Sequence, residues 1–155
     1  VLKVLTRKIS RRPLLRWRPF CFARGGYPER MGFPAPQEML SAAEAKIGRS
    51  LPAPLRQRLA TDNGGIVHDV HGQEWTLYPV LDTTDRKRLA RSAYDIARET
   101  ASARQWTGFP ADAHAIAADG YGNLLVLLPG SDDIEEWDHE TGELKPTAIV
   151  WATTD

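Results

Sequence analysis

Apolar residues spaced four apart predict two short helices early in the folded part of the chain. They mark one face of each helix: Met39, Ala43 and Ile47 in the first, Leu55 and Leu59 in the second. Side chains at this spacing share one face of a helix, which is then buried. We expect the first helix over residues 36–48 and the second over residues 51–63, because Gly48 and the Asn-Gly-Gly run that begins at residue 63 favour the left-handed conformation that ends a helix.

A strand and a long helix are predicted next. Residues 74–80, EWTLYPV, alternate in the manner of a strand. Residues 82–106 are predicted to form the longest helix of the chain. Its buried face would consist of five residues at helical spacing: Leu89, Ala93, Ile96, Thr100 and Ala103. The basic residues of this segment lie largely off that face, which favours a solvated basic surface.

The C-terminal part changes to short apolar segments separated by turns rich in Gly and Asp. Four strands are expected, over residues 115–118, 123–129, 134–139 and 147–153. Connections this short favour an antiparallel meander. The chain is therefore predicted to be an α+β protein, with N-terminal helices packed against a mainly antiparallel C-terminal β-meander sheet.

The composition is that of an ordinary globular domain. A chain of 155 residues, 42% hydrophobic and 26% charged, can bury a core as one domain. Residues 124–128, the longest apolar run, are too few to cross a bilayer, so no membrane association is expected. Cys21 is the only cysteine, which fits a reducing compartment and predicts a cytoplasmic protein.

The zero net charge conceals a strongly basic beginning. Residues 1–30 hold nine of the twenty Lys and Arg residues and one of the twenty acids, which leaves eleven basic and nineteen acidic residues elsewhere. We expect residues 1–30 to be a disordered arm or a non-native upstream extension, because this charge density lacks sustained periodicity. Residues 31–155 then form a single domain. Arginines interleaved with Trp17, Phe20 and Phe22 leave nucleic-acid binding open for the arm alone.

Histidines and acids raise the alternative of a small metal-dependent hydrolase. Its candidate residues are His68, His71, Asp138 and His139. His68 and His71 are three apart and would face opposite sides of a strand, which does not suit a shared ion. The chain has no HExxH or CxxC motif, and GYGN at 120–123 leads into a strand rather than a phosphate-binding helix. No metal and no cofactor are therefore expected.

The acidic segment EEWDHETGE at residues 135–143 is better explained as a hairpin than as a reaction centre. Strand alternation places Glu135 and Trp137 on one face. It places Glu136 and Asp138 on the other face, so the acids do not converge as a catalytic pair must. The glycine in the turn supplies ordinary hairpin chemistry.

Three motifs in a fixed order resemble the SUKH superfamily, which contains yeast Smi/Knr-type cell-wall regulators and many bacterial immunity proteins. They are the LP…NGG turn within residues 51–65, the DGYGN turn at 119–123 and the WDHETG hairpin at 137–142. The resemblance runs from about Pro34 to the end of the chain. It implies an α+β fold without catalytic residues. Similar proteins usually continue into a short final helix, so we expect the chain to be truncated at its C-terminus.

The resemblance implies a non-enzymatic protein-binding module and, in bacteria, an immunity protein that neutralises a cognate toxin by direct binding. A regulatory scaffold of the Smi/Knr type is the alternative binding role. Many toxins that act on nucleic acids carry basic clefts, which an acidic surface would attract and mask. Trp137 would be an anchor only if it is exposed. The predicted partner-binding residues form the acidic hairpin: Asp132, Asp133, Glu135, Glu136, Trp137, Asp138 and Glu140.

The charge pattern of residues 1–30 leads to a direct test. A chain that starts at Met31 should melt cooperatively at nearly the same temperature as the full chain, because the arm is expected to add nothing to the core. Differential scanning calorimetry of both forms measures the difference. A drop of more than several degrees, corresponding to about 1 kcal/mol in a domain of this size, would show that the arm packs on the core.

Overall fold

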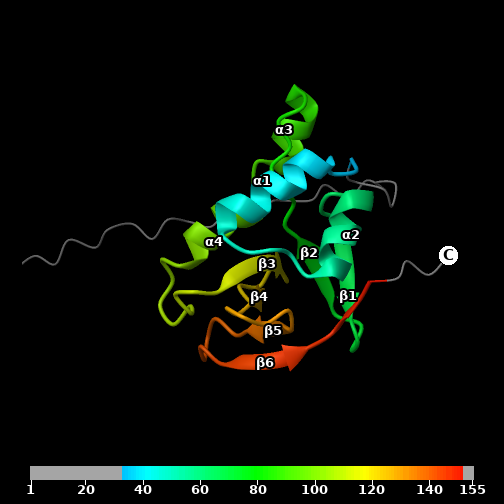
Figure 1. Cartoon of the computed structure of the whole chain (residues 1–155). Coiled ribbons are helices and arrows are strands. Elements are labelled where there is room, and N and C mark those ends of the chain that lie inside the picture. Colours follow the sequence, from blue (N-terminus) through cyan, green and yellow to red (C-terminus); the bar gives the residue numbers. More distant parts are fainter. Residues whose placement is uncertain (1–32, 152–155) are drawn as a thin grey trace, which may run out of the picture.

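The structure, a computed structural model, describes residues 33–151; the predicted arm at 1–30 and the expected C-terminal truncation lie outside them. The fold is α+β, as the sequence predicts (Figure 1). The helices described are α1 (Gln37–Ile47), α2 (Ala53–Thr61), α3 (Arg86–Ser92) and α4 (Ile96–Ala103). The strands are β1 (Ile66–Asp69), β2 (Glu74–Leu77), β3 (His114–Ala118), β4 (Leu124–Leu127), β5 (Ile134–Trp137), β6 (Leu144–Thr147) and β7 (Ile149–Val150). Among these residues no helix combines the length and the apolar character that a bilayer span requires.

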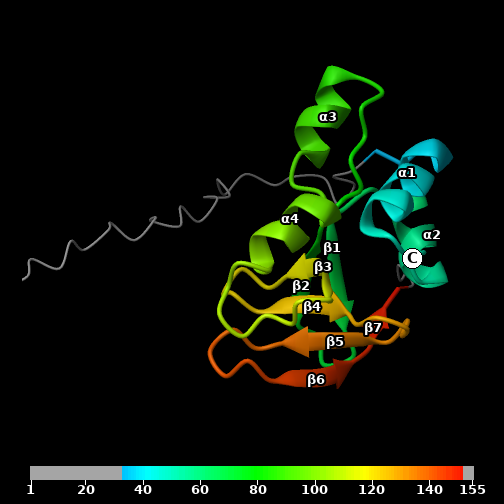
Figure 2. The ribbon, with the colours of Figure 1, turned by 60° about the vertical axis from the view of Figure 1, so that its left-hand side comes forward.

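The strands form one antiparallel sheet in the order β6-β5-β4-β3-β2-β1-β7. The run from β3 to β6 is the predicted meander, since each strand pairs with the next along the chain. β7 instead crosses to the far edge, where Ile149 lies opposite Asp69 of β1. In Figure 2, β1 runs steeply across the direction of β3 to β6, so the sheet twists strongly along this order.

β4 is buried on both faces, and each face carries its own core. Leu125 and Leu127 belong to the larger core, which α1, α2 and the start of α4 complete. Leu124 and Val126 belong to a smaller core on the other face, which the segment 103–113 covers. Burial on both faces explains why this strand is a continuous apolar run rather than an alternating pattern.

Trp137 of β5 fills the smaller core and is fully buried. Its Nε1 donates a hydrogen bond to the carbonyl oxygen of Gly108 at 3.2 Å. The ring of Phe109 meets it edge-on, with 5.2 Å between centroids, and the ring of Trp106 lies 6.0 Å away. Trp137 thus ties the meander to the loop that follows α4, which makes it a core residue.

The prediction of one long helix over residues 82–106 is wrong. The segment forms α3 and α4, which are separated at Asp95. Asp95 has an extended backbone, and its side chain accepts a hydrogen bond from the backbone N–H of Arg98 at 3.1 Å, so it begins a new helix as an N-cap. The residues of the predicted buried face that lie in α4 are buried, namely Ile96, Thr100 and Ala103. Leu89 on α3 is instead 44% exposed.

Two strands also differ from the sequence-based expectation. β1 was not predicted from the sequence. Its four residues alternate between exposed and buried positions, but the run is too short and too polar to stand out as a strand. The expected strand at 147–153 is wrong in its bounds: the fourth strand of the meander is β6, which ends at Thr147, and only residues 149–150 of the expected range form the short β7. Pro146 lies in β6 at the edge of the sheet, where a missing N–H is tolerated. The break after β6 allows the chain to cross to β1.

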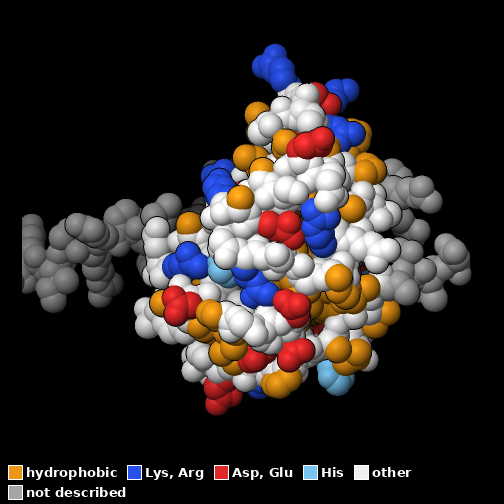
Figure 3. All heavy atoms as spheres, viewed as in Figure 1, with side chains coloured by type: hydrophobic (Ala, Val, Ile, Leu, Met, Phe, Trp, Pro, Cys, Tyr) orange, Lys and Arg blue, Asp and Glu red, His pale blue; other side chains and the backbone are white. Residues whose placement is uncertain are grey.

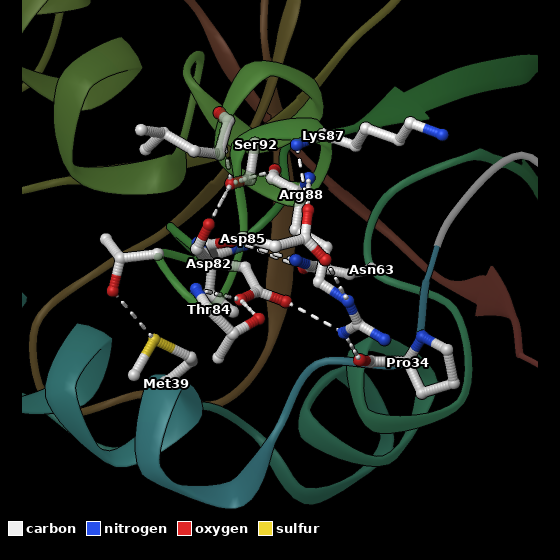
Figure 4. Close-up of polar contacts among 12 residues, drawn as sticks. Pro34, Met39, Asn63, Asp82, Thr84, Asp85, Lys87, Arg88 and Ser92 are labelled. Atoms are coloured by element: carbon white, nitrogen blue, oxygen red, sulfur yellow. Dashed lines mark hydrogen bonds and ion pairs between the residues drawn. The ribbon is translucent and has the colours of Figure 1, made fainter.

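A buried carboxylate fixes the base of α3 (Figure 4). Asp82 is 1% exposed and accepts hydrogen bonds from the Thr84 N–H and from Arg88 Nη1, each at 3.0 Å. The Arg88 guanidinium also lies 4.5 Å from the centre of the Phe33 ring and donates to the Pro34 carbonyl oxygen at 3.1 Å. Burial raises the pKa of Asp82, but the hydrogen bonds from Thr84 and Arg88 outweigh burial and hold the pKa below its usual value.

Replacement of Asp82 by Asn should destabilise the domain in a pH-dependent way. We expect a loss of about 2 kcal/mol at pH 7, because Arg88 loses its charged acceptor. The pKa of Asp82 is lower in the folded state, so its stabilisation is present at neutral pH and is lost as the pH falls below about 4. Urea unfolding of both proteins at pH 7 and at pH 3 measures the difference.

The matched control is Asp112→Asn, which changes an exposed carboxylate and should leave stability unchanged at both pH values. The difference between the native protein and Asp82→Asn should shrink at pH 3, because the stabilisation that comes from the lowered pKa of Asp82 declines as the pH falls below the unfolded-state pKa. A difference of the same size at both pH values would contradict the assigned ionic role.

Candidate functional site

Three turns meet at one end of the sheet, and we call this region the three-turn end. They are the turns at residues 70–73, 119–123 and 138–143, which follow β1, β3 and β5. The register pairs Thr76 with Ala118, so the start of β2 lies beside the end of β3. β4 and β5 are antiparallel in the same way, which brings the second turn beside the third. The chain thus gathers three polar loops on one surface.

Asp69 organises the first turn. Its Oδ1 accepts hydrogen bonds from the N–H groups of His71 at 2.8 Å and Gln73 at 3.0 Å. Its Oδ2 accepts from Nε1 of the fully buried Trp75 at 3.2 Å. Burial raises the pKa of Asp69, but these hydrogen bonds outweigh it and hold the pKa below its usual value. This carboxylate therefore serves the fold and is not free for a partner.

The second and third turns are locked together by one asparagine. Asn123 Oδ1 accepts a hydrogen bond from the His139 N–H at 3.2 Å and from His139 Nδ1 at 2.9 Å, so Nδ1 carries the proton. Asn123 Nδ2 donates to Asp119 Oδ2 at 2.9 Å, and Asp119 Oδ1 accepts from the Tyr121 N–H at 2.7 Å. Gly122 has a φ of +112°, and a Cβ there would lie 2.9 Å from the imidazole ring. The DGYGN and WDHETG motifs are therefore parts of one joint.

A hollow of about 590 Å³ opens beside this joint. Its walls come from the first two turns, the start of β2 and β5: Gln73, Glu74, Asp119, Tyr121, Asn123 and Glu136. Tyr121 stands at its rim and is 85% exposed. Three carboxylates and one exposed aromatic ring thus surround a concave polar surface.

Glu136 has the most perturbed environment in the hollow. Partial burial raises its pKa, and the nearby Asp119, Asp69 and Asp138 raise it further, while Lys145 opposes the shift. The register places Lys145 directly across from Glu136 on β6. A cation that entered the hollow would relieve this mutual repulsion, so the arrangement favours a basic group.

The structure separates the residues of the predicted acidic hairpin. Asp132 and Asp133 precede β5 at the end of the sheet opposite the three turns, and Asp132 forms an ion pair of 2.9 Å with Arg49. Glu135 and Glu136 lie on opposite faces of β5. The predicted acids therefore do not form one continuous surface.

Two further residues of the hairpin are committed to the fold. Asp138 Oδ1 accepts hydrogen bonds from the N–H groups of Glu140 at 2.8 Å and Thr141 at 3.2 Å, and these bonds lower its pKa. Trp137 is buried, so the condition for its role as a partner anchor is not met. Glu136 and the exposed Glu140 remain at the three-turn end.

The candidate hydrolase residues do not form a site. His68 is 3.5 Å from Glu74, whereas His139 is bound to Asn123 on the far side of β2 and β3. His71 lies in the first turn, apart from Asp138 in the third. Within residues 33–151, no group of three or more His, Cys, Asp or Glu side chains lies close enough to hold a metal ion.

Sequence reasoning missed Glu74, Asp119 and Tyr121 as candidate binding residues. The signal for Tyr121 was available, because the middle residue of a tight Gly-rich turn has no neighbours to bury it. Glu74 and Asp119 carried no such signal. They meet only through the pairing of β2 with β3, which the sequence pattern does not specify.

Comparison with known proteins gives one match. No curated protein and no solved structure is significantly similar to this chain. The sequence model of the SMI1 / KNR4 family (SUKH-1) matches residues 34–152, which is most of the chain and contains all three turns. The resemblance seen in the sequence motifs is thereby confirmed, and the chain belongs to the SMI1 / KNR4 family (SUKH-1).

Proposed function

We propose that this chain is a non-enzymatic, cytoplasmic immunity protein that neutralises a cognate toxin by binding it through the three-turn end. The observation that carries the proposal is the concentration of carboxylates around the exposed Tyr121, in a hollow at a rigid joint of the fold. Membership of the SMI1 / KNR4 family (SUKH-1) supports a binding role. A regulatory scaffold would use the same surface with a different partner.

Charge supports a basic partner. Glu74, Asp119 and Glu136 line the hollow, and Glu140 and Glu143 are exposed in the adjacent turn. Lys145 is the only Lys or Arg in the three turns and the strand ends that flank them. An acidic surface of this kind speeds the encounter with a basic surface and can cover it. A toxin with a basic nucleic-acid-binding cleft has the complementary chemistry.

The joint supports binding rather than catalysis. The Asp119 carboxylate accepts from the Tyr121 N–H of its own turn, and the Asn123 amide donates to that carboxylate and accepts from His139 of the third turn. These groups are occupied by structural hydrogen bonds, so proton transfer would disrupt the turns. Tyr121, by contrast, has an exposed ring, while its backbone N–H is held by Asp119. A side chain whose backbone is already fixed loses little conformational entropy when a partner binds it, which suits an interface anchor.

Charge reversal at the three-turn end tests the electrostatic part of the proposal. Glu74→Lys/Glu140→Lys replaces two exposed carboxylates, and its binding to the cognate toxin is compared with that of the native protein. We expect the association rate constant to fall about tenfold at low salt, because long-range attraction is lost. The effect should shrink as salt screens the charges. Surface plasmon resonance across a salt series measures both rate constants.

The double reversal Asp112→Lys/Asp133→Lys is the matched control, because it changes the net charge by the same amount. It replaces exposed acids at the opposite end of the sheet, and its binding should stay close to that of the native protein. An equal loss in the control would show that net charge matters and the three-turn end does not. Unchanged kinetics in the folded Glu74→Lys/Glu140→Lys variant would refute the proposed interface.

Truncation of Tyr121 tests the anchor. Tyr121→Ala should weaken binding about 30-fold, corresponding to about 2 kcal/mol, mainly through faster dissociation. Its melting temperature should not change, because the ring is 85% exposed. Phe at the same position should retain most of the affinity. Full affinity of the Ala variant would show that the partner does not contact this ring.

A further inference from the structure

α3 stands clear of the sheet and of the other helices (Figures 1 and 2). Its inward side is held by Arg88, paired with Asp82 at 3.0 Å, and by Ser92, whose Oγ accepts a hydrogen bond from the Asp82 N–H at 2.8 Å. Asp85 caps its start by accepting hydrogen bonds from the N–H groups of Lys87 and Arg88. α3 is therefore a fixed projection, although it lies outside the cores.

The projection exposes apolar side chains among cations. Leu89 is 44% exposed and Tyr94, just after α3, is 56% exposed. The guanidinium of Arg98 lies 4.6 Å from the centre of the Tyr94 ring. The folded domain gains little from exposing these apolar groups. We call this surface the α3 knob, which consists of Arg86, Lys87, Leu89, Arg91, Tyr94 and Arg98.

The α3 knob reverses the charge of the domain around it. Residues 33–151 contain eleven Lys and Arg residues and eighteen acids, yet residues 86–98 contain five of those cations and one acid. That acid is Asp95, the N-cap of α4. In Figure 3, Lys and Arg side chains lie at the tip and sides of the projecting end, with some acidic side chains among them, and further acids on this face lie lower down. The basic character is therefore local.

We propose that the α3 knob docks an acidic protein partner, one that presents carboxylates around an apolar side chain. Charge complementarity selects the carboxylates, and Leu89 with Tyr94 supplies the apolar contact. Nucleic acid fits less well, because the Arg98 guanidinium lies 4.6 Å from the centre of the Tyr94 ring and covers one face of it. Leu89 offers a nucleotide no stacking surface.

An amphipathic acidic peptide is the probe for this surface. The peptide carries Leu at every third or fourth position among Glu residues. One control is the same peptide with each Leu replaced by Ser. The other control is a single-stranded oligonucleotide of equal charge. Titration into the ¹⁵N-labelled protein should shift resonances of the α3 knob. Arg86→Glu/Lys87→Glu should weaken binding at least tenfold and Leu89→Ser about fivefold. The Ser peptide should bind more weakly than the Leu peptide.

Further controls distinguish an acidic protein partner from other ligands of the α3 knob, and binding at the α3 knob from binding at the three-turn end. Lys46→Glu and Ile66→Ser change an exposed cation and an exposed apolar residue elsewhere and should leave the affinity unchanged. Glu74→Lys/Glu140→Lys should not weaken peptide binding, whatever it does to toxin binding. Tighter binding of the oligonucleotide together with no effect of Leu89→Ser would overturn the proposal in favour of nucleic acid. Concentration-dependent shifts without peptide would assign the α3 knob to a second copy, and absence of shifts there would also refute the proposal.

Discussion

Burial of β4 on both faces is the constraint on which the rest of the structure depends. Leu125 and Leu127 need the layer of α1 and α2, while Leu124 and Val126 need the loop that Trp137 holds in place. Each buried aliphatic side chain contributes about 2 kcal/mol, so neither cover can be removed for a partner without a large loss. The middle of the sheet is therefore closed to binding. The ends of the sheet and α3 lie outside these two cores.

The family motifs act at one of these ends, but their role is structural. Asn123, His139 and Gly122 join two turns through hydrogen bonds and close packing. The side chains of Tyr121 and Glu136 line the hollow beside this joint, to which Tyr121 contributes only its backbone N–H. This division explains why the motifs allow the fold to be recognised but do not identify a partner. The side chains that would contact a partner can vary while the joint stays intact.

The sequence predicts elements whose signals are local. Helical spacing and terminal glycines suffice for α1 and α2, and short turns suffice for the meander. The division between α3 and α4 was missed because Asp95 fits a helix surface as well as an N-cap. The acidic hairpin misled for a geometric reason. Asp132 and Glu140 are close in sequence, but β5 between them spans about 13 Å, so they lie at opposite ends of the sheet.

The three-turn end and the α3 knob carry opposite charge, and this affects how any partner approaches. The α3 knob follows the end of β2 that lies opposite the first of the three turns. At physiological salt the screening length is about 8 Å, so a partner responds mainly to the nearer of these two surfaces. A basic partner is attracted by the three-turn end and repelled by the α3 knob, which biases its orientation before contact. An acidic partner has the reverse preference. With both proposed interfaces in use, the domain would engage one partner of each charge at separate surfaces.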